Sequence, residues 1–163
     1  MKKVRNIEDV INNKFIKPGS RIYVSGNAAT PQRLLSVLAT DESIRQVELI
    51  GVLLLGDIDP LFSEAASRRI THRVIFNGPA SRKAINQGRA KYQLFHLSEI
   101  PRQVRHHLMP DVAMISVSGP DTGGNYSLGT TVESVLAAVE TVKRNGGSVI
   151  AERNASMPFV LGC

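Results

Sequence analysis

Short apolar runs recur along the chain and alternate with segments of helical periodicity. Each run is continuous or nearly so and is bounded by Gly, Pro, Asn or Asp, which is typical of a strand. Because apolar and polar residues do not alternate within the runs, we expect both faces of each strand to be covered, as in a parallel sheet. The predicted strands are residues 22–25, 47–55, 73–76, 112–117 and 148–151.

Amphipathic helices are predicted between these strands. The segment 31–39 follows Thr30, a good capping residue, and begins with a proline whose φ already suits a helix. The segment 130–142 has apolar residues at helical spacing, and its Thr130 and Glu133 have the spacing of a capping box. Less regular patterns predict helices at residues 6–12, 59–69, 79–89 and 98–107.

This alternation predicts an α/β fold, a three-layer α/β/α sandwich around a mostly parallel sheet. The 163 residues contain no linker or repeat, so residues 1–163 are predicted to form one α/β domain. In open sheets of this class, ligands bind at the carboxyl ends of the strands. That rule selects four loops, with the sequences SGNAATP, LGDIDP, FNGPAS and SVSGPDTGGNYSLG.

The longest of these loops combines glycines with polar side chains. Its glycines permit positive φ and close approach of a ligand to the backbone, while Asp121, Asn125, Tyr126 and Ser127 offer polar groups. A binding lip and an ordinary turn explain this composition equally well. The glycine spacing matches neither a P-loop nor a dinucleotide-binding fingerprint, so neither motif is supported.

The charge of the chain points to anionic partners without identifying them. The formal net charge is +6 and the isoelectric point is about 9.8. The basic residues are dispersed over several predicted helices, which favours solvated helix faces, then phosphate-bearing small molecules, over a nucleic-acid surface. A basic nucleic-acid-binding protein is therefore the least favoured function.

Metal and membrane functions find little support in the sequence. The one cysteine is Cys163, and the four histidines, which we interpret as surface or capping residues, lack helical metal-ligand spacing. No metal is predicted. The amino terminus lacks the apolar core of a signal peptide, and no apolar run approaches the roughly 20 residues that cross a bilayer. We therefore expect a cytoplasmic protein without membrane contact.

Four motifs in order resemble the amino-terminal domain of the acetyl-CoA hydrolase and transferase family, especially the 4-hydroxybutyrate and acetate CoA-transferases of class I. They are GSRIYVSGNAATP, FNGPASRKAINQGRAKYQLFHLSEIP, PDVAMISVSGPDTGGNYSLGTTVE and VIAERNASMP, and the likeness runs from about Val10 to Met157. The resemblance implies a CoA-transferase-like fold of two similar halves with acyl-CoA at their junction. A coenzyme A thioester and a small carboxylate would be substrates, with no permanently bound cofactor.

The resemblance also implies that catalysis needs a glutamate from the carboxyl-terminal half of the family. This sequence stops at MPFVLGC, so we expect a truncated fragment that is inactive alone, and we assign no catalytic residue. Glu133 is interpreted as a helix cap, Glu140 as a solvated helix residue and Glu152 as the residue after a strand. A separate carboxyl-terminal half is a possible partner. Exposure of the face that would meet it predicts self-association that covers residues 159–161.

By the same resemblance, ten residues would line the substrate side of the cleft. They are Gly26, Asn27, Ala28, Ala29, Gly119, Pro120, Asp121, Asn125, Tyr126 and Ser127. Asn77, Gly78 and Pro79 lie in another loop at this edge, although a plain turn explains them about as well. The alternative to half of an enzyme is a stand-alone module that binds acyl-CoA or a small anion.

Overall fold

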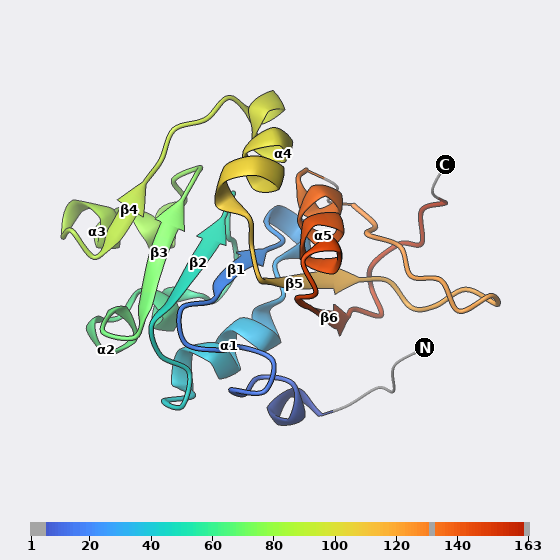
Figure 1. Ribbon diagram of the computed structural model, residues 1–163, viewed down its shortest axis with the longest axis horizontal. Coiled ribbons are helices and arrows are strands. Elements are labelled where there is room, and N and C mark those ends of the chain that lie inside the picture. The colour runs from blue at the N-terminus through green and yellow to red at the C-terminus, as the bar shows by residue number, and fades with distance from the viewer. Residues whose placement is uncertain (1–5, 131–132, 162–163) are drawn as a thin grey trace.

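A sheet of six parallel strands forms the centre of the molecule (Figure 1). The computed structural model describes residues 6–130 and 133–161. The strand order is β4-β3-β2-β1-β5-β6. The strands are β1 (Arg21–Val24), β2 (Val47–Gly51), β3 (Ile70–Val74), β4 (Ala90–Tyr92), β5 (Val112–Val117) and β6 (Ser148–Arg153).

Helices cover both faces of this sheet, so the predicted three-layer α/β/α sandwich is confirmed (Figure 1). On one face lie α1 (Gln32–Thr40), the 3-10 turn Asp59–Phe62 and α3 (Pro79–Asn86). On the other lie α4 (Ile100–Gln103), a π-helical turn (Val104–Leu108) and α5 (Val135–Arg144). The remaining short helix is α2 (Glu64–Ser67), and further 3-10 turns are Ile7–Asp9, Asn27–Ala29 and Leu97–Glu99.

The buried side chains of the strands alternate between two hydrophobic clusters, one on each face of the sheet. In β1, Ile22 and Val24 pack on the α1 side, whereas Tyr23 between them packs on the α5 side. All six residues of β5 are buried. The continuous apolar runs in the sequence reflect this burial on both faces.

The strand predictions are confirmed at β1, β5 and β6 and need correction elsewhere. The run 47–55 is too long, because β2 ends at Gly51 and residues 52–55 form a loop. The third strand lies at Ile70–Val74 instead of 73–76, since its polar residues hid its first half. β4 was missed because it is a three-residue edge strand with two exposed residues.

The helix predictions locate most helices but not their ends. Segment 59–69 is a 3-10 turn followed by α2, whose cap is Ser63, and segment 98–107 is α4 continued by the π-helical turn. At the amino terminus, 6–12 contains only a 3-10 turn. α1 lacks a Thr30 cap, because that hydroxyl accepts from the Leu55 amide and donates to the Asn27 carbonyl.

The predicted capping box at residues 130 and 133 is wrong. α5 begins at Val135, and the preceding Thr131 and Val132 lie outside the described residues. Glu133 makes a different contact, with the loop that follows β1.

Candidate functional site

The order of the strands reverses at β1, and this reversal locates the candidate site. From β1 the chain adds β2, β3 and β4 on one side, and β5 and β6 lie on the other. In an open parallel sheet, the crevice at such a switch point lies between the loops that follow the two central strands. Here those loops begin at Ser25 and Ser118, so the structure carries both predicted binding loops from this one edge of the sheet.

Ser25 makes hydrogen bonds that connect the first loop to β5, the strand next to β1. The Ser116 amide donates to Ser25 Oγ at 3.1 Å, and this hydroxyl donates to the Ala29 carbonyl at 2.6 Å. Asn27 has a positive φ of 52° and donates its backbone N–H to the Leu53 carbonyl at 2.7 Å. Ala28 is exposed at the edge and Ala29 is buried. The loop is thus held on both sides of β1.

Gly26 sits at a crowded point of this loop. A Cβ atom there would lie 2.6 Å from the Leu53 carbonyl oxygen and 3.1 Å from Glu133 Oε1. Any side chain would therefore push this loop away from Leu53, in the loop that follows β2, and from Glu133. The Gly26 N–H points to Glu133 and donates to its Oε1 at 2.9 Å.

Glu133 is a functional candidate that the sequence did not reveal. Burial raises the pKa of its carboxyl group, and the hydrogen bond from Gly26 opposes that rise. Among the described residues its second oxygen, Oε2, is buried without a hydrogen-bond partner. The contact spans 107 residues of chain, so no local pattern could have announced it.

The second loop closes on itself at its base. Ser118 donates its backbone N–H to the Ser127 carbonyl, and Ser127 returns a bond to Ser118 Oγ, each at 3.0 Å. Beyond this pair the chain extends away from the sheet as the orange loop of Figure 1. The base therefore lies at the end of β5, while the tip reaches away from the first loop.

The polar residues of the tip bind each other. The Asn125 amide donates to Asp121 Oδ1 at 2.7 Å, and Asn125 Nδ2 donates to Oδ2 at 3.0 Å. These bonds, first of all that from the Asn125 side chain, lower the pKa of Asp121. In residues 6–130 and 133–161, no hydrogen bond joins Asp121 or Asn125 to residues 26–29. Pro120 and Tyr126 are exposed.

The whole chain, residues 1–163, matches the model of the acetyl-CoA hydrolase/transferase N-terminal domain. The chain belongs to this family. It is 32% identical over 152 residues to a succinyl-CoA:acetate/propanoyl-CoA:succinate CoA transferase of Fasciola hepatica, and 31% identical over 149 residues to a 4-hydroxybutyrate coenzyme A transferase of Clostridium kluyveri. These matches cover 91% and 90% of this chain but only 30% and 34% of the relatives. The chain thus spans about a third of their length.

Solved structures agree on the fold. A RipA mutant superposes with a TM-score of 0.86 at 23% identity, covering 98% of this chain and 38% of the other. The 4-hydroxybutyrate CoA-transferase of Porphyromonas gingivalis gives 0.71 at 24% identity, covering 96% and 34%. The resemblance stated from the motifs is confirmed, and so is the CoA-transferase-like fold.

In this acetyl-CoA hydrolase/transferase domain, the Ser127 hydroxyl binds the carboxyl-terminal segment. This hydroxyl donates to the Val160 carbonyl at 2.8 Å and accepts from the Val160 amide at 3.1 Å. Gly119 lies beside Arg153, whose Nε would be 3.8 Å from a Cβ at that position. The second loop is therefore built against the segment that follows β6.

Glu152 and Glu140 also bind other groups of the chain. Glu152 was expected after a strand but lies inside β6. Its Oε2 accepts from the Leu34 amide in the first turn of α1 at 3.0 Å, so it acts as a helix cap. Glu140 forms an exposed ion pair with Arg105 at 3.1 Å, as expected for a solvated helix face.

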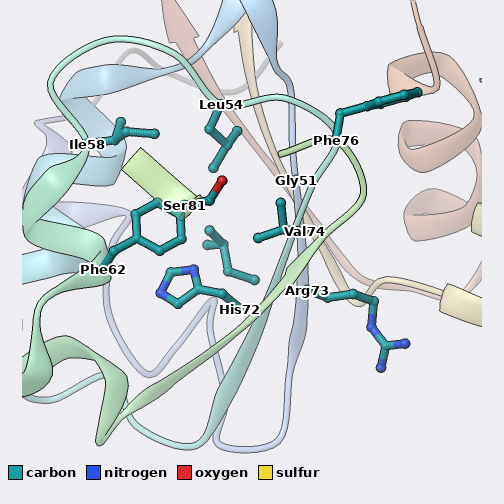
Figure 2. Close-up of a pocket in the computed structure, with 10 residues that line it drawn as sticks. Gly51, Leu54, Ile58, Phe62, His72, Arg73, Val74, Phe76 and Ser81 are labelled. Carbon is teal, nitrogen blue, oxygen red and sulfur yellow. The ribbon is translucent and has the colours of Figure 1, made fainter. Parts of the chain in front are cut away.

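A small cavity of about 10 Å³ lies under β2 and β3, outside the switch point (Figure 2). His72, Phe62 and Ser81 are among the residues that line it (Figure 2). This volume is about that of one water molecule, too small for a substrate. The nearby loop at Asn77 is a turn at the start of α3, closed by the Ser81 hydroxyl, which donates to Asn77 Oδ1.

His72 contradicts the interpretation of the histidines as surface or capping residues. Its side chain is buried, its Nε2 lies 2.8 Å from the Leu61 carbonyl, and its ring packs on Phe62. Burial lowers its pKa to about 4. Across residues 6–130 and 133–161, no group of three or more His, Cys, Asp or Glu residues could hold a metal ion.

Several basic side chains support the fold. Arg69 donates to the carbonyls of Ala39, Asp41 and Ile44, and Arg73 pairs with Glu48 at 2.7 Å. A shallow hollow of about 450 Å³ with a basic lining lies at the amino ends of the strands, the opposite edge from the switch point.

Within the described part of the chain, no helix has the length and apolarity to span a bilayer.

Proposed function

We propose that this chain is the acyl-CoA- and carboxylate-handling part of a CoA-transferase or acetyl-CoA hydrolase and that it is inactive alone. Membership of the family supports the class of reaction. The names of the relatives from Fasciola hepatica and Clostridium kluyveri supply the substrate class, a CoA thioester and a small carboxylic acid. The observation that carries the proposal is the placement of both predicted loops at the switch point.

The first loop would offer its backbone and the edge residues Asn27 and Ala28 to the substrate. The second loop would approach from β5, with Gly119 at its base and Tyr126 exposed. Reaction of a thioester through a glutamate nucleophile requires a free carboxylate and donors for the developing oxyanion. Glu133 and Glu152 at this edge are both bound to backbone amides, which supports a nucleophile from outside this chain.

Self-association belongs to the same proposal. Phe159, Val160 and Leu161 are 39%, 52% and 84% exposed, and Tyr126 on the neighbouring loop is 41% exposed. The bonds between Ser127 and Val160 hold these apolar side chains on one part of the surface. Exposed apolar groups of this kind recruit partners, here a second copy or a separate carboxyl-terminal half.

Two measurements on the purified chain test this function. Titration with acetyl-CoA, followed by amide NMR shifts, should perturb residues 26–29 and the base of the second loop. A thiol assay should detect no release of coenzyme A above the uncatalysed rate. Release at an enzymatic rate would disprove the inactivity. Perturbation confined to the basic hollow at the amino edge would disprove the location and favour a general anion or nucleic-acid site.

A further inference from the structure

The hollow at the amino ends of the strands, here called the amino-edge hollow, gathers cations that the sequence disperses. Arg21 comes from β1, Arg68 and Arg69 directly precede β3, and Lys91 comes from β4. The only carboxylate among the lining residues is that of Glu48. The volume of about 450 Å³ lies in the range of small-molecule sites. The hollow therefore has the size and the charge of a site for an anion.

Part of its wall is a sheet face that the helices leave open. Ile70 and Ala90 pack in the hydrophobic cluster on the α1 side, so Thr71 and Lys91, one residue further along β3 and β4, point to the α5 side. Among the described residues, β3 and β4 contribute nothing to the buried cluster on that side, and Thr71 and Lys91 are exposed. Parallel sheets are normally covered on both faces. An open polar face suits contact with a polar ligand.

The carboxylates near the hollow do not compensate its charge. Glu48 is already bound by Arg73, a cation outside the lining, at 2.7 Å. Arg73 and Lys91 are partners in the register of β3 and β4, so two like charges lie on neighbouring strands. Across residues 6–130 and 133–161 Lys91 forms no ion pair. Arg68 pairs with Glu64, but both side chains are exposed and such pairs are weak.

Two arginines of the lining are held in place by neutral groups. Arg21 Nη1 donates to the Leu108 carbonyl at 2.9 Å, and Arg69 donates to three carbonyls. The nearby carboxylate of Asp111 accepts from the Arg21 backbone N–H at 2.8 Å. A carbonyl fixes the position of a guanidinium without cancelling its charge. Cations held in advance reduce the entropy that an anion loses on binding.

We propose that the amino-edge hollow binds a small anion with two or more phosphate groups. A single negative charge would leave most of the lining cations uncompensated, whereas a multiply charged phosphate compound matches them. Arginine and lysine both bind phosphate oxygens, and Thr71 adds an exposed hydroxyl. The hollow lies at the opposite edge from the switch point, so this inference does not rest on the proposed function.

The test uses inorganic pyrophosphate and the purified chain. In calorimetry at constant ionic strength, with sodium chloride as the reference, sodium pyrophosphate should give one saturable binding event. It should raise Tm by about 3 to 6 °C at ten times Kd. Amide NMR shifts should change at residues 67–71 and at Lys91, and should stay unchanged at residues 26–29.

Substitutions of exposed lysines locate the site. Lys91→Gln should weaken pyrophosphate binding about tenfold, because it removes one hydrogen bond between charged groups. Lys91→Arg keeps the charge and should retain most of the affinity. Lys143→Gln removes the same charge from an exposed residue of α5 outside the lining and should bind like the wild type. Thr71→Glu, which places a second carboxylate in the hollow, should abolish the binding heat.

Each contrary result overturns the inference. An equal loss in Lys91→Gln and Lys143→Gln would show a general attraction of the basic chain for polyanions. Citrate that binds as tightly as pyrophosphate would overturn the assignment to phosphate. Absence of saturable pyrophosphate binding would reject the site, and salt-sensitive binding of an oligothymidylate in its place would assign the surface to nucleic acid.

The proposed function is judged separately. Because coenzyme A also carries phosphates, the acetyl-CoA titration is repeated with Lys91→Gln. Shifts at residues 26–29 that persist in this variant support the proposed function, whatever the result with pyrophosphate.

Discussion

Replacing His72 with glutamine should remove much of the acid sensitivity of folding between pH 6.5 and 4. His72 is buried against Phe62, and its Nε2 bonds to the Leu61 carbonyl at 2.8 Å. Burial is the main reason that its pKa falls from 6.5 to about 4, and the charge of Arg89 contributes in the same direction. The folded protein therefore keeps this ring neutral at a pH where the unfolded chain binds a proton.

The size and sign of the effect follow from that difference. Above pH 6.5 the imidazole is neutral in both the folded and the unfolded state, so the full contribution of His72 to the stability of the fold is present. As the pH falls toward 4, the unfolded state takes up a proton that the folded state refuses, so stability is lost. At about 1.4 kcal/mol per pH unit, the loss reaches about 3 kcal/mol. The free energy of unfolding of a typical domain is roughly 5–15 kcal/mol, so this loss would be a large part of it.

Urea denaturation followed by circular dichroism, repeated from pH 7.5 to 4.5, measures this loss. The wild type should lose stability steeply in this range, and His72→Gln should lose much less. His106→Gln, at an exposed histidine, should follow the wild type. The raised pKa of Glu133 stabilises the folded protein as the pH falls, and the lowered pKa of Asp121 destabilises it. Both effects are the same in every variant and cancel in the difference between variants. Parallel curves for wild type and His72→Gln would refute the reasoning.

Three further changes test other parts of the fold. Arg69→Ala should cost about 2–4 kcal/mol in urea denaturation, because three carbonyls lose a charged donor, while Arg68→Ala should cost under about 0.5 kcal/mol. Gly147→Ala should lower Tm by roughly several degrees, because its Cβ would lie 2.0 Å from the Asp111 carbonyl oxygen and the backbone would have to shift. Ser127→Ala should speed proteolysis near Val160, because it removes both hydrogen bonds between the Ser127 hydroxyl and the Val160 backbone. Mass spectrometry of the fragments measures the rate. Unchanged stability or cleavage would contradict each expectation.

The sequence predicted the fold where side-chain burial leaves a local pattern. β5 appears as a continuous apolar run because all six of its residues are buried. β4 leaves no such run, because two of its three residues face solvent. The start of β3 was hidden by His72, a polar residue whose burial depends on a carbonyl eleven residues away. Local patterns therefore fail where tertiary contacts decide burial.

The candidate site shows the same limit. Motifs and the carboxyl-end rule selected the two loops, because strand ends can be found from the sequence. The partner of Gly26 could not be found, since Glu133 has capping-box spacing and its real contact is 107 residues away. The pairing of Asp121 with Asn125 was also missed, although its spacing of four residues is a local signal of a closed turn.

The position of β1 in the sheet has a consequence for synthesis of the chain. β1 needs two neighbours, and one of them, β5, arrives about ninety residues later, as the bond between Ser25 and Ser116 shows. Until then a nascent chain that ends after β4 has an apolar central strand as an open edge. Such edges pair readily with other polypeptides. Ribosome-bound intermediates of this length are the stage at which we expect aggregation and chaperone capture.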